Sequence, residues 1–560
     1  MSEHWHARVS QPRYRTRVEK NDRVAMRDGV RLCVDIYRPE AGGRFPALLG
    51  ASPYSKDVQK LPVPEHPTDR ELGNGGIEAG DSDYFVSRGY VHVIADARGT
   101  GHSEGAYRVY SLKEQQDGHD LVEWMAGEPW CDGNVGMLGS SYFGIYQLLT
   151  AAQQPPHLKA IAPVDTATDA YRHRAYHGGI LHRSFISTWW EGSLVAHTAD
   201  QVDLAQEELS RVVAELKERP DIKSNPRLWK ALEFPWTNPH LFDILTHPFD
   251  GPFYWERSAY TKLDRIRIPT FLLGRWSAHY LHLPGSFQAY EGIDTPKRLM
   301  ITVPESGSGY NRPWHENHDL LLRWYDHWLK RNDTGLMEEP PVKIFVQGAN
   351  RWRDENEWPL ARTQWKRLSL GANGSLKEDG PGWNERPDRF TNVVALLPGQ
   401  PVPALRYATA PLAQDTEVTG PMALTLYGSI SGTDTNWIVE VEDLAPDGKA
   451  TRVSIGWLKA SHREMDESKS KAYQPFHPHT RALPVTPGRV ERYAIEIRET
   501  SYVFKAGHSL QLRVKAQDAP WEGASYVYRL SLHLAPHEEM RHTVYHTPEY
   551  PSCLLLPVIP

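Results

Sequence analysis

Residues 135–152 of this 560-residue chain read Val-Gly-Met-Leu-Gly-Ser-Ser-Tyr-Phe-Gly-Ile-Tyr-Gln-Leu-Leu-Thr-Ala-Ala. A short apolar run typical of a buried strand meets a Gly/Ser cluster, and apolar residues at helical spacing follow. Strand, sharp turn and helix with one serine at the apex form a nucleophile elbow. Gly139 and Gly144 flank Ser141 where a crowded turn leaves least room for a Cβ atom. The following helix would direct backbone N–H groups at an oxyanion that forms near Ser141.

Length and composition limit the class of protein. A chain of 560 residues is expected to form two or three domains, and 40% hydrophobic residues with 19 Trp and 26 Tyr indicate a folded protein. A net charge of −7 without a basic cluster argues against a nucleic-acid partner. Cys33, Cys131 and Cys553 have no motif spacing, so no disulfide framework is predicted. The N-terminus has no apolar signal region and no later stretch approaches a membrane-spanning length, which predicts a cytoplasmic protein without a membrane partner.

Strand and helix signals alternate on both sides of the elbow. Asp28-Gly29 between two strand-like runs indicates a hairpin over residues 22–39. Alternation of buried strands with helices is the pattern of an α/β sheet. The other expected elements are strands at 47–50, 91–95, 135–138, 269–274 and 299–303 and helices at 113–127 and 318–330.

Two further regions differ from this pattern. Residues 168–262 have the pattern of helices with long loops, clearest at 200–218, and such an insertion into an α/β-hydrolase sheet predicts a cap over the active site. Beyond Thr334-Gly335, short alternating segments predict a β-sandwich of the jelly-roll type. These segments include 342–346, 423–427, 437–441 and 511–514. The predicted domains are an α/β-hydrolase domain (1–167 and 263–335), a helical cap (168–262) and a C-terminal jelly roll (336–560).

Several motifs carry a family resemblance. The chain resembles the CocE/NonD hydrolases, relatives of cocaine esterase, α-amino acid ester hydrolases and X-Pro dipeptidyl-peptidases. The resemblance runs from about residue 20 to the C-terminus and implies an α/β-hydrolase domain, an inserted helical cap and a C-terminal jelly roll. Its markers are Met26-Arg-Asp-Gly-Val-Arg-Leu32, Pro53-Tyr54, Asp96-Ala-Arg-Gly-Thr-Gly-His-Ser-Glu-Gly105, Gly139-Ser-Ser-Tyr-Phe-Gly144, Arg323-Trp-Tyr-Asp-His-Trp-Leu-Lys330 and Phe504-Lys-Ala-Gly-His508.

The resemblance implies three roles at the elbow. Ser141 takes the position of the family nucleophile, and Tyr142 would give its backbone N–H to the oxyanion hole. Tyr54 matches the family tyrosine whose phenol supplies the second donor. Each donor aimed at a developing oxyanion contributes about 3 kcal/mol to lowering the barrier.

Both partners of the nucleophile are missing from their expected positions. The family acid belongs in Gly274-Arg-Trp-Ser-Ala-His-Tyr-Leu-His282, which contains no carboxylate. Ala278, or alternatively Ser277, holds the acid's place. The family histidine belongs in a turn that corresponds to Val303-Pro-Glu-Ser-Gly-Ser-Gly309, and this turn contains no histidine.

Three hypotheses for the base follow, since a serine nucleophile needs one within hydrogen-bond reach. In the first, His315 is the base and Glu305 or Glu316 orients it. In the second, His279 or His282 fills the site from the acid's loop. In the third, the triad is lost by divergence or substitution.

The resulting expectation is a serine hydrolase that cleaves a small-molecule ester or amide through an acyl-enzyme on Ser141, with no cofactor or metal. An acyltransferase or cyclase on the same scaffold and a non-catalytic binding protein are the alternatives, and a homo-oligomer stays open. His4-x-His6 and His477-x-His479 lack a third ligand, so neither predicts a metal site. Two hypotheses compete for a set of tryptophans, an apolar acyl pocket or ordinary core packing: Trp189, Trp190 and Trp276.

Overall fold

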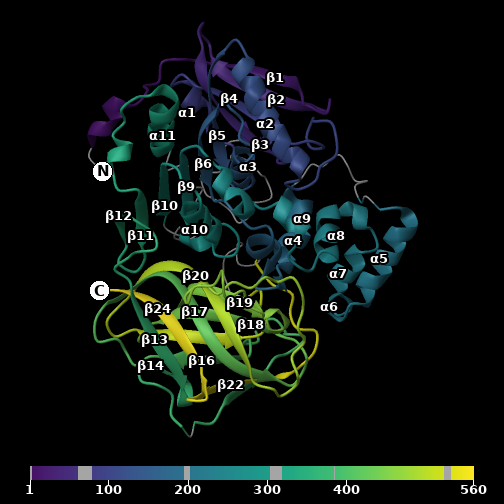
Figure 1. Cartoon of the computed structure of the whole chain (residues 1–560), viewed down its shortest axis with the longest axis vertical. Coiled ribbons are helices and arrows are strands. Elements are labelled where there is room, and N and C mark those ends of the chain that lie inside the picture. Colours follow the sequence, from purple (N-terminus) through teal and green to yellow (C-terminus); the bar gives the residue numbers. More distant parts are fainter. Residues whose placement is uncertain are drawn as a thin grey trace.

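The computed structural model describes residues 3–60, 78–193, 202, 204–302, 318–383, 385–522 and 531–560. Figure 1 shows an α/β half above, a β-rich C-terminal half below, and a group of helices projecting to one side. Within these residues no helix is long and apolar enough to cross a membrane.

The first sheet is parallel in its centre, where neighbouring strands from β4 across to β11 pair in parallel. It is antiparallel at both edges, where β1 pairs with β2, β2 with β4, and β11 with β12. Its central strands are buried along almost their whole length, as expected for a parallel sheet covered by helices on both faces. Across the sheet the order is β1 (Thr16–Ala25), β2 (Arg31–Pro39), β4 (Val91–Asp96), β3 (Phe45–Ser52), β5 (Cys131–Ser140), β6 (Leu158–Val164), β9 (Thr270–Arg275), β10 (Lys297–Thr302), β11 (Val342–Val346) and β12 (Arg351–Glu355).

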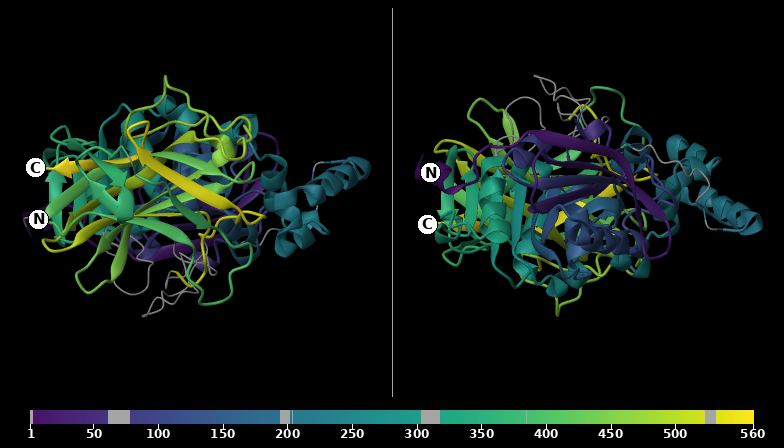
Figure 2. Two further views of the ribbon diagram at one scale, coloured as in Figure 1. Left: turned by 90° about the horizontal axis from the view of Figure 1, so that it is seen from below. Right: turned by 90° about the horizontal axis from the view of Figure 1, so that it is seen from above.

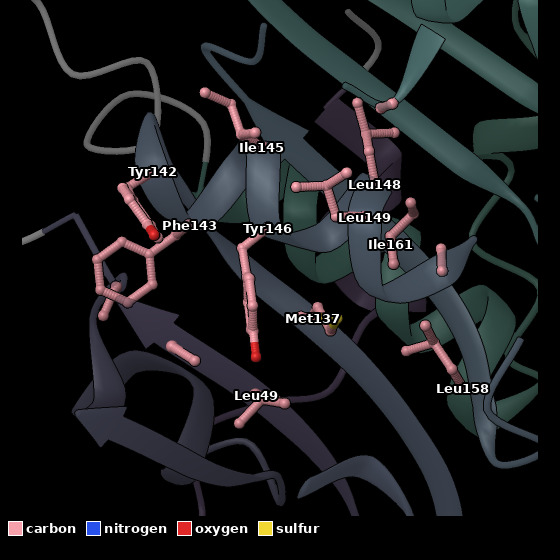
Figure 3. Close-up of a cluster of buried hydrophobic side chains, with 14 of the residues drawn as sticks. Leu49, Met137, Tyr142, Phe143, Ile145, Tyr146, Leu148, Leu149, Leu158 and Ile161 are labelled. Carbon is pink, nitrogen blue, oxygen red and sulfur yellow. The ribbon is translucent and has the colours of Figure 1, made fainter. Parts of the chain in front are cut away.

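Helices cover both faces of this sheet. The side chains of α2 (Leu112–Gly127), α3 (Tyr142–Ala151) and α10 (Leu283–Gly292) share one hydrophobic core. A second core lies under α11 (His318–Lys330) together with Phe85 of α1 (Ser82–Val86). Figure 3 shows Tyr142, Phe143 and Tyr146 of α3 beside Leu49 and Met137 of the strands. The elbow helix is therefore anchored by its own aromatic residues.

The second sheet closes on itself. Strand β17 pairs with β20 on one side and with β24 at the other end of the strand order, so no open edge separates them. This β-rich domain beside an α/β domain confirms the predicted fold class. The strand order is β15 (Asp388–Thr391), β22 (Arg541–Thr547), β17 (Thr416–Ile430), β20 (Glu491–Phe504), β19 (Ala450–Lys459), β18 (Asn436–Leu444), β21 (Ser509–Lys515), β16 (Ala404–Ala408), β14 (Ser375–Lys377), β13 (Gln364–Gly371) and β24 (Cys553–Ile559), with β23 (Tyr550–Pro551) beside β22.

The segment between β6 and β9 is mainly helical. It begins with a π-helical turn, η4 (Tyr171–Ala175), and a small hairpin of β7 (Tyr176–His177) and β8 (Ile180–Leu181). This hairpin contacts the C-terminal domain, because Lys459 N donates to Gly178 O and Leu534 N donates to Leu181 O. Figure 2 shows the outer helices projecting from one end of the molecule. The helices are α4 (Arg183–Ser193), α5 (Gln206–Glu218), α6 (Pro220–Lys223), α7 (Pro226–Ala231), α8 (Pro239–Thr246) and α9 (Pro252–Glu256).

Two expected elements differ from the structure. The strand over 342–346 was predicted for the sandwich, but β11 pairs in parallel with β10 of the first sheet. Its alternating burial pattern fits either sheet, so the sequence could not assign it. The helix predicted over 200–218 begins only at Gln206, within the described part of that segment.

Candidate active site

Ser141 lies at the turn between β5 and α3 with φ 58° and ψ −113°. Such a conformation costs a non-glycine residue about 1 to 3 kcal/mol and persists only where the surroundings hold it. The turn is held by two backbone hydrogen bonds, from Ser141 N to Val164 O and from Ile145 N to Ser141 O, both 2.9 Å. The residue is half-buried. The predicted strand–turn–helix geometry is therefore present, with the serine at its apex.

The two glycines of the motif are required by close packing. Gly139 has φ +137°, and a Cβ atom there would lie 2.4 Å from Cβ of Phe143. A Cβ atom on Gly144 would lie 2.4 Å from the carbonyl oxygen of Val164. Any larger residue would force the helix away from the sheet and move the serine.

His282 is the histidine that the structure brings to Ser141. Its Nε2 lies 3.3 Å from Ser141 Oγ, within hydrogen-bond reach. The ring is placed by a helical turn after β9, in which His282 N donates to Ala278 O at 3.1 Å, and α10 begins with the next residue. Long hydrogen bonds are common in unliganded active sites and tighten when substrate binds.

The electrostatic surroundings keep His282 neutral. Burial lowers the pKa of the imidazole well below its usual value, and the nearby charges of Arg275 and Arg174 lower it further. A neutral imidazole accepts a proton through Nε2 only when Nδ1 carries its own hydrogen. Within the described part of the chain, Nδ1 of His282 has no hydrogen-bond partner. The ring is therefore placed as a base, and no described group orients it through Nδ1.

No described carboxylate takes the place of the missing acid at Nδ1. Ala278 at the acid's position is buried and has no polar side chain. The carboxylate of Asp165, directly after β6, forms a buried ion pair of 2.9 Å with Arg275. Arg275 stands beside Trp276 in the segment where the family carries its acid, so it engages this carboxylate and adds positive charge near His282.

The other candidate bases have different positions. His315, with Glu305, Glu316 and the turn 303–309, lies outside the described residues, and the hypothesis that it is the base stays a prediction. His279 is half-buried, its Nε2 has no partner among the described residues, and desolvation lowers its pKa to about 3. The hydrogen bond to Ser141 comes from His282, so the second hypothesis is the one with a geometric counterpart.

Tyr54 lies on the loop after β3 and is fixed from several sides. Gln59 Nε2 donates to Tyr54 O at 2.9 Å, and Asp96 Oδ1 accepts from Lys56 N at 2.7 Å. The phenol oxygen accepts a hydrogen bond of 2.9 Å from Nε1 of Trp189 in α4. Because indole N–H is only a donor, the phenol oxygen is the acceptor of this bond, which fixes its position.

Tyr142 supplies both a backbone donor and a buried support. As the first residue of α3 it has an N–H without an acceptor inside the helix. Its hydroxyl donates to Glu114 Oε1 at 2.6 Å, and Glu114 Oε2 accepts from Tyr110 N at 2.7 Å. Burial raises the pKa of Glu114 to about 8. The Tyr54 ring packs edge-on against the Tyr142 ring with centroids 5.8 Å apart, which places the phenol loop against the elbow.

The tryptophans divide between the site and the core. Trp189 stacks parallel to Tyr142 and bonds Tyr54, so it belongs to the site. Trp190 stacks on Tyr107 at 5.6 Å. Trp276 is fully buried and donates to Phe345 O at 2.7 Å, so it packs in the core. Among the described residues no three His, Cys, Asp or Glu side chains are grouped to hold a metal ion.

Two features of the site were missed in the sequence. The Trp189 donor to Tyr54 joins residues 135 positions apart, and no local pattern announces it. Arg174, whose charge reaches His282, stands in the run Arg172-His-Arg174. That run of three basic residues is the sequence signal by which Arg174 could have been identified.

Comparison with known proteins finds relatives along nearly the whole chain. A family model described as X-Pro dipeptidyl-peptidase (S15 family) matches residues 28–305, and a model of the X-Pro dipeptidyl-peptidase C-terminal non-catalytic domain matches residues 334–555. The cocaine esterase of Rhodococcus sp. is 27% identical over 97% of this chain and 98% of its own length. A putative serine esterase of Mycobacterium tuberculosis is 27% identical over 91% of this chain and 92% of its own.

A solved structure shows the same fold. The CocE/NonD family hydrolase from Staphylococcus aureus superposes with a TM-score of 0.80 at 24% identity and covers 97% of this chain and 94% of its own. An α-amino acid ester hydrolase superposes with a TM-score of 0.74 at 21% identity, over 98% of this chain and 97% of its own. Both domains are therefore shared with these proteins along nearly their full length.

Proposed function

This chain belongs to the X-Pro dipeptidyl-peptidase S15 and CocE/NonD family of serine hydrolases, and we propose that it cleaves an ester or amide through an acyl-enzyme on Ser141. The observation that carries the proposal is the 3.3 Å contact between Ser141 Oγ and His282 Nε2 at a strained elbow. A half-buried serine hydroxyl on a neutral imidazole is the minimum for nucleophilic catalysis.

Each step follows from the residues in place. Ser141 Oγ attacks the substrate carbonyl carbon while His282 Nε2 takes the hydroxyl proton. The negative charge that forms on the carbonyl oxygen receives hydrogen bonds from Tyr142 N–H and the Tyr54 phenol. The leaving alcohol or amine departs with the proton from His282. Water then attacks the acyl-enzyme, gives a proton to His282, and releases the acid as that proton returns to Ser141.

The rate expected from this site is modest. Without an acceptor at Nδ1, the imidazolium formed during attack gains no stabilisation from a carboxylate among the described residues. Loss of that partner in a serine triad costs about 10⁴-fold in kcat, while the oxyanion hole and substrate binding alone retain about 10³-fold over water. A slow enzyme is therefore the expected phenotype.

Hydrolysis of a series of 4-nitrophenyl esters tests the proposal. Wild-type protein should give slow turnover that Ser141→Ala abolishes, whereas His279→Ala, which changes a neighbouring imidazole, should retain it. Acyl transfer to an added alcohol or amine at the expense of free acid would point to the acyltransferase alternative. No turnover by wild type beyond that of Ser141→Ala would support the non-catalytic alternative and contradict the proposal.

A further inference from the structure

Arg174 is a buried cation that pairs with no carboxylate among the described residues. Only 6% of the surface of Arg174 is exposed. Within the described part of the chain, its guanidinium makes no hydrogen bond or ion pair, whereas its backbone oxygen accepts a hydrogen bond of 3.1 Å from His182 Nδ1. A buried, uncompensated charge is costly, so proteins pair such groups unless a ligand does so.

The neighbouring Arg172 shows what a structural arginine looks like in the same turn. Its Nη1 forms ion pairs with Asp169 at 2.9 Å and Asp250 at 2.8 Å, and its Nη2 donates to His477 O at 2.8 Å. Both residues stand on the π-helical turn η4, a rare geometry that is frequent at functional sites. The turn directs Arg172 into a network of ion pairs and hydrogen bonds, whereas Arg174 has no acceptor among the described residues.

Arg174 points toward the groups around Ser141. Its guanidinium lies over the ring of Tyr110 at 4.8 Å and over the ring of Trp189 at 6.0 Å from the ring centroids. Trp189 is the residue that bonds the Tyr54 phenol. The positive charge of Arg174 also lowers the pKa of His282 and of His240, a buried histidine whose ring packs against Trp189. Arg174 therefore lies beside the residues that surround Ser141, on the side formed by the segment between β6 and β9.

From this arrangement we propose that Arg174 binds a carboxylate carried by the substrate, so that the preferred ester or amide is an anionic one. The proposal rests on the hydrolase function above and names its substrate class. A guanidinium matches a planar carboxylate through two parallel hydrogen bonds. A single unpaired arginine balances one negative charge, which favours a carboxylate over a doubly charged phosphate.

Kinetics with matched substrates test the charge preference. One pair places the charge on the acyl side: 4-nitrophenyl hydrogen adipate against its methyl ester. A second pair places it on the leaving group: 4-carboxyphenyl butyrate against the methyl ester of that acid. Wild type should favour the anionic member of at least one pair by about 10- to 100-fold in kcat/KM, the range expected for a charged hydrogen-bonded contact.

Variants assign the preference to Arg174. Arg174→Gln should reduce the ratio within the favoured pair to about one, and Arg174→Lys should retain part of it. Arg257→Gln is the matched control, because Arg257 is a nearby cation already paired with Glu256 at 3.2 Å, and it should keep the wild-type ratio. Equal loss with the charged and the neutral ester in Arg174→Gln would overturn the proposal.

Binding separates this proposal from the hydrolase proposal. Calorimetry with benzoate and its neutral analogue benzamide needs no turnover, so a protein that hydrolyses nothing still answers the question. Wild type should bind benzoate more tightly, and Arg174→Gln should lose the difference. Arg174→Met should not lower Tm, since it removes an unpaired buried charge. Equal binding of both probes, tighter binding of inorganic phosphate than benzoate, or a Tm loss in Arg174→Met would each contradict the assignment.

Discussion

Ser141 Oγ contacts Nε2 of His282, a histidine on the connection after β9 where the family resemblance places an acid. Ala278, at the acid's own position, lies one helical turn before His282. The carbonyl oxygen of Ala278 accepts a hydrogen bond from the backbone N–H of His282. The base of Ser141 thus comes from the connection after β9, and the other ring nitrogen of His282, Nδ1, has no partner among the described residues. Four consequences can be measured.

Supplying a carboxylate at residue 278 should improve the base. Side chains four residues apart on a helical turn lie on the same face, so Ala278→Asp brings an acceptor beside His282 Nδ1. Stabilisation of the imidazolium should raise kcat for ester hydrolysis by at least about tenfold. The isosteric Ala278→Asn, without charge, is the control and should give a smaller gain. A kcat in Ala278→Asp at or below that of wild type, in a variant with unchanged Tm, would contradict the assigned role of His282.

The acidic limb of the pH–rate profile should lie at low pH. Because burial, Arg275 and Arg174 lower the pKa of His282, the neutral form persists below the pH at which an ordinary histidine protonates. The kcat/KM of wild type should therefore stay flat from about pH 8 down through about pH 6.5, the usual histidine pKa. Ala278→Asp should move the limb upward, since a carboxylate favours the charged ring. A wild-type limb centred near or above pH 6.5 would show that another group is the base.

Removal of the Tyr54 hydroxyl should slow the chemical step. Tyr54→Phe deletes one oxyanion donor, for which about 10²- to 10³-fold in kcat is expected with KM little changed. Trp189→Phe keeps the phenol and removes only the indole donor that fixes its oxygen, so its loss should be smaller. Pre-steady-state acylation rates measure both. An unchanged acylation rate in Tyr54→Phe would exclude the phenol from the oxyanion hole.

The buried Glu114 should make stability fall as pH rises. Burial raises its pKa from 4.5 to about 8, so between these values the folded protein holds a proton that the unfolded chain releases. Stability from this group is complete below about pH 4.5 and is lost as pH rises through about 8, with a slope of at most about 1.4 kcal/mol per pH unit. Denaturant unfolding of wild type and Glu114→Gln from pH 5 to 8 should show this slope in wild type only. Parallel curves would contradict it.

Much of the fold could be predicted because its signals are local. The elbow glycines, the hairpin at Asp28-Gly29 and the amphipathic stretch that forms α11 each carry their geometry within about a dozen residues. Strand β11 was assigned to the wrong sheet because an alternating pattern specifies a strand and its buried face but not its partners.

The site was predictable only where the family motif is contiguous. Ser141 and Tyr142 belong to one motif, and Tyr54 follows a strand at an expected place. His282 is 141 residues from Ser141, and no local pattern in the sequence distinguishes it from His279, because only the fold decides which ring reaches the serine. Arg174 was missed for the same physical reason: packing decides which arginine is paired, and in the described part of the chain it brings carboxylates to Arg172 but not to Arg174.

Labelling with a fluorophosphonate, followed by intact mass, tests the central claim most directly, because the reagent reacts only with an activated serine. Wild type should gain one phosphonyl group, Ser141→Ala none, and His282→Ala should label at least about 100-fold more slowly, while His279→Ala and His315→Ala label like wild type. Unlabelled wild type, or a His282→Ala variant that labels as fast as wild type, would contradict the account.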